Sequence, residues 1–263
     1  MQKIRFGDVE LKALFALEEK DAGILTLAEL AKMLRLSKVQ SWKLASRLVR
    51  KNRLIRLKRG VYLFAPMKSG RKGLWTDDAY KLLPKLMGKK DYYVGFWTAL
   101  NYYGLTEQIP VNVQVVTTSR QRSFEALQSR FYFIQVKKLG QWQEEKIGNA
   151  LVKFATIEQL MLDCLTMPEN CGGIIVACQA LWEARKRINW EKLEELAANS
   201  NDAARRRLGY LCELLKIHKF KAKKPVGWRW LDSSRRKEKL GVSSNWGLIL
   251  NFSEEELTQW RDY

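Results

Sequence analysis

The residues of this chain best suited to chemistry are cations that can bind a polyanion. The stretch from Leu44 to Phe64 holds seven cationic side chains and no anionic one. The seven are Arg47, Arg50, Lys51, Arg53, Arg56, Lys58 and Arg59. An ordinary solvated surface mixes the two signs, so a stretch of one sign predicts an anionic partner.

The charge of the whole chain also favours a polyanionic partner. Its 263 residues include 47 Lys and Arg against 28 Asp and Glu, a net charge of +19. Such a field favours nucleic acid, an acidic protein or an anionic membrane. No apolar run reaches the roughly 18 residues needed to cross a bilayer, and the first residues lack the apolar region and cleavage site of a signal peptide. We therefore expect a cytoplasmic protein without a membrane partner.

Other residue types give little support for a metal site or a cofactor. The four cysteines do not form paired CxxC motifs, so they are better interpreted as buried reduced thiols than as zinc ligands. They are Cys164, Cys171, Cys178 and Cys212. His218 is the only histidine, which excludes His-based metal sites and leaves one residue for any catalytic triad. No phosphate-binding glycine motif is present, so we expect no cofactor and no metal.

A metal-dependent nuclease is the enzymatic alternative. Glu144 and Lys146 form an E-x-K triplet between two β-rich runs, as a magnesium-dependent nuclease would require. The preceding residues, 110–136, contain only Glu125 as an acid. The carboxylates at Glu144 and Glu145 therefore form a single cluster, which is too few to hold the magnesium ion of a nuclease. Glu158 and Asp163 point to different faces of an expected helix, which a helix cap and a structural hydrogen bond explain. We therefore predict that the chain is not an enzyme.

The cations near the N-terminus must be positioned by a small helical domain. Apolar residues at helical spacing predict a first amphipathic helix over residues 8–20, with Val9, Leu11, Leu14, Phe15 and Leu17 on its apolar side. Thr26 with Glu29, and Ser37 with Gln40, form capping boxes that open a second and a third helix. Two capped helices separated by a tight turn indicate a helix-turn-helix.

The third helix and the residues after it predict a winged helix-turn-helix over residues 1–68. Two short apolar strands follow the helix, with Gly60 in the turn between them. The cations then lie on the recognition helix and the wing, where phosphates of double-stranded DNA would pass. On the third helix, Ser41, Leu44, Ala45 and Leu48 share the predicted core face. The predicted DNA-binding residues are Lys38, Gln40, Trp42, Lys43, Arg47, Arg50, Arg56, Lys58 and Arg59.

Alternatives stay open within this interface. Many winged helices are protein–protein modules rather than DNA readers. Trp42 is as well suited to packing against the first helix as to touching a sugar or a base. Gln40 could pair with adenine and Arg47 with guanine if either reaches the floor of the major groove.

The remainder of the chain, residues 74–263, predicts a larger α+β domain behind a linker at residues 65–73. Helices are expected at 77–87 and 92–103, followed by three β-rich runs: VNVQVVT, RFYFIQV and ALVKFAT. Further helices are expected at 157–165, 174–187, 190–198 and 203–216. In the tail, NWGLILNF is similar to a strand and SEEELTQW to a capped helix. The expected fold is therefore an N-terminal winged helix-turn-helix followed by a mixed α+β domain.

Several motifs are similar to those of a known family. The run YYVGFWTALNYYGLTEQIPVNVQVVT resembles the segment after the winged helix in antitoxins of abortive-infection AbiE (type IV) toxin-antitoxin systems, which are also transcriptional regulators of viral defence. RGVY, TIEQLMLDCL and RRRLGYLCELL are similar to the same family and occur in its order. The resemblance spans most of residues 8–216.

The resemblance implies a protein of two parts. The winged helix would bind inverted repeats in its own promoter, and the larger domain would counter a nucleotidyltransferase toxin encoded in the same operon. A sequence-specific repressor without a toxin partner is the alternative within the DNA-binding class. The basic segment from Lys219 to Lys239, with nine cations against two acids, matches no motif of the family, and its role is left open.

Overall fold

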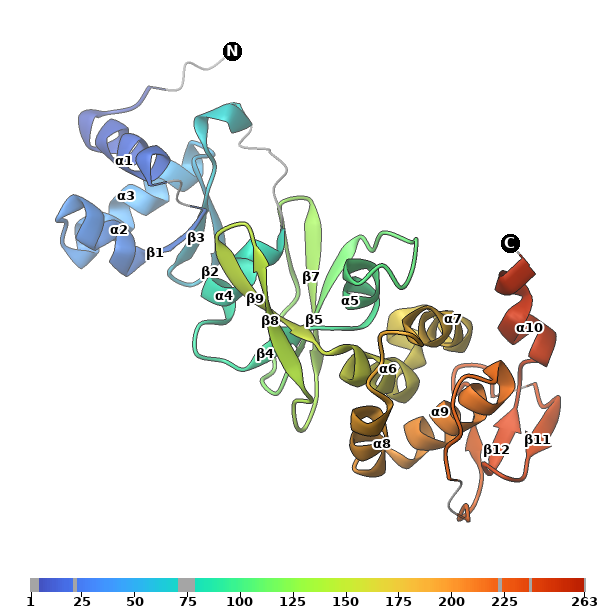
Figure 1. The fold of residues 1–263 in the computed structure, drawn as a ribbon. Helices are drawn as coiled ribbons and strands as arrows, with labels where there is room; N and C mark the ends of the chain where they lie inside the picture. The colour runs from blue at the N-terminus through green and yellow to red at the C-terminus, as the bar shows by residue number, and fades with distance from the viewer. Residues whose placement is uncertain (1–4, 21–22, 71–78, 222–223, 237, 263) are drawn as a thin grey trace. The chain divides into compact units, whose positions relative to one another are not determined.

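The computed structural model describes residues 5–20, 23–70, 79–221, 224–236 and 238–262 (Figure 1). The chain divides into two compact units. The first comprises Met1–Lys90, Arg122–Tyr132 and Lys146–Val152, and the second comprises Asp91–Gln121, Phe133–Glu145 and Lys153–Tyr263. The first unit is thus larger than the predicted winged-helix range of residues 1–68.

The first unit begins with a winged helix. Its elements are α1 (Asp8–Glu19), β1 (Ile24–Thr26), α2 (Leu27–Leu34), α3 (Lys38–Arg50), β2 (Leu54–Lys58) and β3 (Val61–Phe64). Both predicted capping boxes are present, at Thr26 and at Ser37. The predicted hairpin is also present, and β1, which the sequence analysis missed, adds a third antiparallel strand in the order β1-β3-β2.

The core of the winged helix lies between the three helices and the sheet. The predicted face of α3 is confirmed, because Ser41, Leu44, Ala45 and Leu48 are its buried residues. The prediction for α1 was partly wrong. Val9, Leu11 and Phe15 are exposed, whereas Glu10, Ala13, Leu14 and Leu17 are buried. The buried positions follow the i, i+3, i+4, i+7 spacing of one narrow stripe, and Phe15 lies about 150° around the helix from the centre of that stripe.

A six-stranded sheet follows the winged helix along the chain. Its strands are β4 (Tyr92–Val94), β5 (Asn112–Thr117), β6 (Phe124–Ala126), β7 (Ser129–Gln135), β8 (Trp142–Ile147) and β9 (Ala150–Ala155), in the order β6-β7-β5-β4-β9-β8. The three predicted β-rich runs became β5, β7 and β9. The helix predicted for 92–103 was wrong in its first part, because Tyr92, Tyr93 and Val94 pair with β5 as the strand β4. Only α5 (Phe96–Tyr102) is helical there.

The helix predicted for 77–87 is shorter and irregular. A 3₁₀ turn, η2 (Ala79–Leu82), precedes α4 (Leu83–Met87), and residues 77 and 78 lie outside the described residues. Pro84 stands in the first turn of α4, where its missing N–H leaves no hydrogen bond unmade. Proline therefore starts this helix rather than breaking it.

The second unit ends in helices and a small sheet. The helices are α6 (Ile157–Thr166), α7 (Ile174–Ala184), α8 (Trp190–Ala198), α9 (Asp202–Leu215) and α10 (Glu254–Thr258), with 3₁₀ turns η3 (Pro168–Cys171) and η4 (Gln259–Asp262). The strands β10 (Arg229–Trp230), β11 (Gly241–Ser243) and β12 (Leu248–Leu250) form a sheet in the order β10-β12-β11. The predicted helices and the strand in NWGLILNF are confirmed, and so is the α+β class.

Candidate nucleic-acid interface

The outward face of α3 is fixed by its buried face. At about 100° per residue, Val39, Lys43, Ser46 and Arg50 point directly away from the core. Lys43 and Arg50 are exposed, and Val39 is 62% exposed. Val39 was missed as a candidate, although an apolar residue on the outward arc could have been found from the helical spacing alone. An apolar group there suits contact with a thymine methyl.

Five of the predicted cations are exposed and lie free of the protein's own acceptors. Among the described residues they have no hydrogen bond and no ion pair. They are Lys38, Lys43, Arg50, Arg56 and Arg59. Trp42 is 58% exposed, so it lies on the surface beside these cations rather than packed against α1. Three elements of the winged helix therefore present positive charge to solvent: α3, β2 and the turn of the wing.

Arg47 lies on the flank of this face and contacts α1. Its Nε is 3.4 Å from Glu10 Oε1, and Lys51 Nζ is 2.5 Å from Glu10 Oε2. Lys51 also lies over the ring of Phe6. These two cations have a partner within the fold. Arg47 contacts Glu10 through Nε alone among the described residues, so a guanine could be read only by its two Nη groups while that contact holds.

Glu10 is the buried carboxylate that organises this flank. Burial opposes its ionisation. The hydrogen bonds from Lys51 and from the Gly7 N–H, together with the charges of Lys51 and Arg47, outweigh burial and hold the pKa of the Glu10 carboxyl below its usual range. The Gly7 N–H that donates to Glu10 Oε2, at 3.0 Å, belongs to the N-cap residue of α1. One residue thereby ties the start of α1 to the C-terminal half of α3.

The wing is held from both sides. The carbonyl of Gly60, which has φ of +75°, accepts a hydrogen bond from the Leu27 N–H at 2.9 Å. Lys58 Nζ donates to the carbonyl oxygen of Leu86. Burial, and then the nearby charge of Lys90, lowers the pKa of Lys58. Lys58 is therefore bound to α4 in this structure, whereas Arg59 at the tip has no such contact with any residue that the structure describes.

Arg53 has a structural position. Its side chain is buried, and its guanidinium donates to the carbonyls of Pro66 at 3.3 Å and Gly70 at 2.8 Å. The first part of the predicted linker is thereby packed against the winged helix, and residues 71–73 lie outside the described residues. The guanidinium of Arg53 is therefore stabilised by backbone carbonyl oxygens and is not available to a polyanion.

Gln40 performs the N-terminal capping of α3. Its Oε1 accepts a hydrogen bond from the Ser37 N–H at 2.9 Å, and Ser37 Oγ accepts one from the Gln40 N–H at 3.3 Å. The side-chain amide N–H₂ has no partner among the described residues. A bidentate pair with adenine needs both ends of the amide, so any base contact by Gln40 competes with, or shares, its oxygen.

Two of the residues considered for catalysis are held in structural contacts: Glu158 accepts from the Asn189 N–H at 3.0 Å, and Asp163 accepts from the Tyr93 hydroxyl at 2.8 Å. Glu144 and Lys146 are exposed, and Glu145 between them accepts from the Tyr102 hydroxyl at 3.1 Å. Within the described ranges there is no group of three His, Cys, Asp or Glu residues that could hold a metal ion. The four cysteines are buried free thiols. In the same residues, no helix is long and apolar enough to span a membrane.

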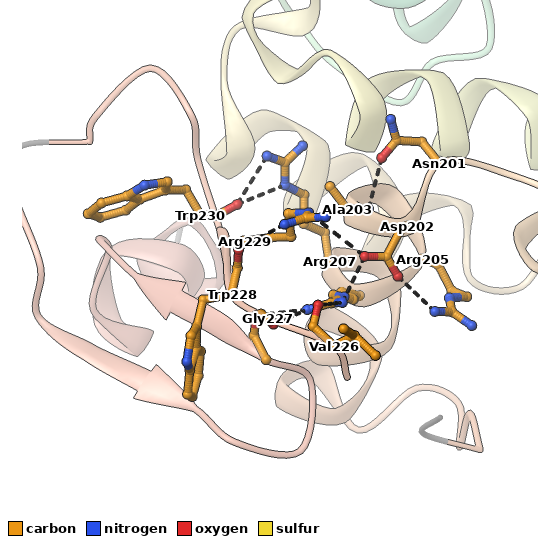
Figure 2. A network of polar contacts seen from close by, with 12 residues as sticks. Asn201, Asp202, Ala203, Arg205, Arg207, Val226, Gly227, Trp228, Arg229 and Trp230 are labelled. Carbon is orange, nitrogen blue, oxygen red and sulfur yellow. Dashed lines mark hydrogen bonds and ion pairs between the residues drawn. The ribbon is translucent and has the colours of Figure 1, made fainter. Parts of the chain in front are cut away.

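A second group of arginines lies on α9 and points inward (Figure 2). Arg206 and Arg207 are each 4% exposed. Arg206 donates to the carbonyls of Val226 at 2.9 Å and Gly227 at 2.7 Å, and it lies 2.8 Å from Asp202 Oδ2. Arg207 donates to the carbonyls of Leu165 at 2.6 Å and Trp230 at 3.1 Å. These side chains fasten the segment after α9 to the helices.

A three-helix winged fold with an outward cationic face is typical of transcriptional regulators that bind DNA. Two family models match the chain: "Transcriptional regulator, AbiEi antitoxin" over residues 12–65, and "AbiEi antitoxin C-terminal domain" over residues 93–214. The chain belongs to the AbiEi antitoxin family. Its second matched region contains α5 to α8, nearly all of α9 and most of the six-stranded sheet, so the resemblance to this family is confirmed.

Comparison with solved structures gives a similar fold. The crystal structure of the RV2827C protein from Mycobacterium tuberculosis matches with a TM-score of 0.69, over 99% of this chain and 97% of that chain. The identity is 13%, so this likeness shows the fold alone. A search of the curated proteins found no match.

Proposed function

We propose that this antitoxin represses its own operon by binding inverted repeats in the promoter through α3 and the wing, and that its larger domain counters a nucleotidyltransferase toxin encoded alongside. The regulator and antitoxin class rests on the two family matches. The promoter repeats and the type of toxin rest on the family resemblance.

One observation carries the DNA-binding part. The cations on the outward face of α3 and at the wing are exposed and have no partner in the described part of the chain, whereas Arg47, Arg53 and Lys58 are taken up by the fold. A recognition helix in the major groove meets phosphates on its flanks and base edges along its outward ridge. Lys38, Lys43, Arg50, Arg56 and Arg59 then contact phosphate or base edges, and Val39 and Trp42 face the groove.

The salt dependence of binding tests this interface. If five cations per protomer neutralise phosphates, log K should fall with log salt at a slope of roughly −4 to −5. The measurement is a fluorescence-anisotropy titration of a duplex that carries the promoter, repeated at several salt concentrations. A slope near zero would show that the face does not bind DNA.

Substitution at the wing distinguishes free cations from committed ones. Arg59→Ala should weaken both promoter and random-sequence binding, because a wing cation meets phosphate or the minor groove. Lys58→Ala should weaken binding less than Arg59→Ala, since the Leu86 carbonyl already holds its ammonium group. Lys12→Ala, an exposed cation on α1, is the matched control and should leave affinity unchanged. A loss for Lys58→Ala as large as the loss for Arg59→Ala would contradict this assignment.

The antitoxin part is tested with the neighbouring gene. We expect that gene to encode a protein with the Gly-Ser and Asp-x-Asp signature of a nucleotidyltransferase, and its expression to arrest growth unless this chain is co-expressed. A Lys43→Ala, Arg50→Ala double variant should still rescue growth, because those side chains serve the promoter. A neighbouring gene without the signature, or without toxicity, would favour a repressor that has no toxin partner.

A further inference from the structure

The small sheet at the end of the second unit has one apolar face that is open to solvent. Strand register places Trp230, Ile249 and Val242 side by side across β10, β12 and β11. Side chains alternate between the faces of a strand, so Trp228 and Leu240 share this face with their neighbours two residues on. Trp228 is 50% exposed, Val242 is 46% exposed and Leu240 is 62% exposed, whereas Trp230 and Ile249 are half-buried. We call these five residues the outer face.

The opposite face of the same sheet packs against α9. Leu231 and Leu248 are completely buried, and the ring of Trp246 packs directly against Gly209 of α9, where an added Cβ would lie only 2.0 Å from the ring. Arg229 points to this inner side, 3.8 Å from Asp202. The sheet is therefore anchored on α9, and its outer face is left without a covering element among the described residues.

The backbone that carries Trp228 and Trp230 is held rigidly. Arg206 binds the carbonyls of Val226 and Gly227, and Arg207 binds the carbonyl of Trp230. Figure 2 shows both indole rings on the side of this segment away from the contacts of Asp202 with the arginines. A fixed backbone presents the rings at a low cost in conformational entropy on binding, as a binding platform requires.

We propose that the outer face binds unpaired nucleotides of a nucleic-acid strand, with bases stacked on Trp228 and Trp230. Residues two apart on a strand are about 6.6 Å apart, which is about two base steps, so one strand running along β10 can contact both rings. Base stacking on aromatic side chains beside a cationic surface is the general way in which proteins bind single strands. This site is independent of the winged helix and of the proposed operator binding.

Charge favours nucleic acid over other occupants. Residues 184–263 carry 18 basic and 11 acidic residues. The described segments that lead into β10 and β11 expose four cations, namely Lys221, Lys224, Arg236 and Lys239. A second copy of the chain would bring two such segments together at a cost in repulsion. A phosphate backbone beside the stacked bases would be attracted by the same cations.

Binding of labelled single strands tests the proposal. The probes are fluorescent oligo-dT and oligo-U of about 12 nucleotides, within the usual site size of such proteins, titrated with the full chain. Trp228→Ala should weaken binding of the single strand about tenfold, the size of one lost base stack. Trp228→Phe should restore much of the affinity. A promoter duplex should bind the Trp228→Ala protein as it binds the unaltered protein, because the winged helix is unchanged.

Controls separate this site from nonspecific effects and from the operator site. Trp142→Ala removes another partly exposed tryptophan, 38% exposed on β8, and should leave single-strand affinity unchanged. Lys43→Ala should weaken binding of the duplex but not of the single strand.

Preference for oligo-U over oligo-dT would identify RNA as the source of the strand, and equal binding would show recognition through bases and phosphates alone. Absence of single-strand binding, or equal losses for Trp228→Ala and Trp142→Ala, would overturn the proposal. A Trp228→Ala protein that instead loses self-association or its toxin would assign the face to a protein partner and overturn it as well.

Discussion

The recognition helix α3 and the helix α9 both carry clustered cations, but their cations have different partners. On α3, Lys43 and Arg50 extend into solvent without a partner among the described residues. On α9, Arg206 and Arg207 are buried, and their guanidinium groups donate to carbonyl oxygens of the C-terminal segment and of α6. The two helices have a similar density of positive charge in the sequence. The difference lies in the acceptors within the fold, which occupy the cations of α9 and leave those of α3 available to a polyanion. We call a buried arginine that holds backbone carbonyls in this way a clamp.

The difference has a physical cause. A buried guanidinium is tolerated only when its N–H groups and charge are satisfied, and Arg207 achieves this with backbone carbonyls rather than with a direct ion pair. Burial lowers the pKa of Arg207, and the charges of Asp232 and Glu169 oppose that shift. An exposed cation has no such requirement, so it stays available for an external anion. The predictions below test this distinction.

The largest effect is expected from removal of a clamp. Arg207→Ala leaves the carbonyls of Leu165 and Trp230 without their donor, and should lower the free energy of unfolding by about 3 to 5 kcal/mol. Urea unfolding followed by circular dichroism measures the change. Arg205→Ala is the matched control on the same helix. Its half-buried side chain forms an ion pair with Asp202 at 2.8 Å, and its loss should cost less than about 1 kcal/mol.

If Arg207→Ala yields no folded protein, Arg207→Lys provides the measurement. Lysine keeps the charge but cannot reach two carbonyls with a planar fork, so an intermediate loss is expected. Equal stability of the Arg205 and Arg207 variants would contradict the distinction between clamp and surface cation.

A half-buried charge of the opposite sign sharpens the comparison. Asp163 on α6 is half-buried, and burial raises its pKa to about 6, despite hydrogen bonds from the Tyr93 hydroxyl and the Gln159 amide. Because the folded pKa lies above the unfolded value of 3.8, the stabilising contribution is complete below pH 3.8 and is lost as the pH rises through 6. A shift of about two units corresponds to about 3 kcal/mol.

Asp163→Asn should therefore gain stability relative to the unaltered protein as the pH is raised from 5 to 8, by about 1.4 kcal/mol, the part of the loss that falls between pH 5 and the folded pKa. Urea unfolding at both values measures the difference. Asparagine retains an acceptor for Tyr93 while it removes the ionisation. An advantage that did not change with pH would show that Asp163 is not the titrating group.

For the exposed cations of α3, we expect a loss of DNA binding without a loss of stability. The Lys43→Ala, Arg50→Ala double variant should weaken promoter binding by about 2 kcal/mol, or about thirtyfold. Its free energy of unfolding should change by less than about 0.5 kcal/mol, since neither side chain has a partner in the described residues. A matching loss of stability would mean that these cations serve the fold, as Arg207 does.

The sequence predicted the winged helix well because its signals are local. The two capping boxes and the buried face of α3 depend on residues three or four apart, and both are confirmed. Strand β4 could not be predicted in the same way. Tyr92–Val94 pairs with Asn112–Thr117, which lies far along the chain, and this tertiary pairing overrides the local preference for helix.

The candidate site was only partly predictable for the same reason. Arg47, Arg53 and Lys58 are cations of the kind that bind DNA, but each has an acceptor within the fold. Arg47 contacts Glu10, and Lys58 donates to the Leu86 carbonyl. Arg53 donates to the carbonyls of Pro66 and Gly70. No periodicity in residues 44–64 indicates those contacts, because each depends on how separate segments pack. Charge in the sequence therefore identified the helix and the wing, and the fold selected which of their cations are available.

The smallest expected effect concerns Gln40, which lies between the two roles. Its oxygen caps α3, while its amide N–H₂ faces outward without a partner in the described residues. Gln40→Glu keeps the capping oxygen and removes both N–H donors, so the free energy of unfolding should stay within about 0.5 kcal/mol of that of the unaltered protein.

If the amide donates to a base, the ratio of promoter to random-sequence affinity should fall about fivefold, which corresponds to about 1 kcal/mol. Anisotropy titrations with both duplexes measure the ratio. The added negative charge lowers the affinity for both DNAs alike, so only the ratio reports base reading. An unchanged ratio would show that Gln40 caps the helix and reads no base, which would place it with Arg207 among the residues that serve the fold.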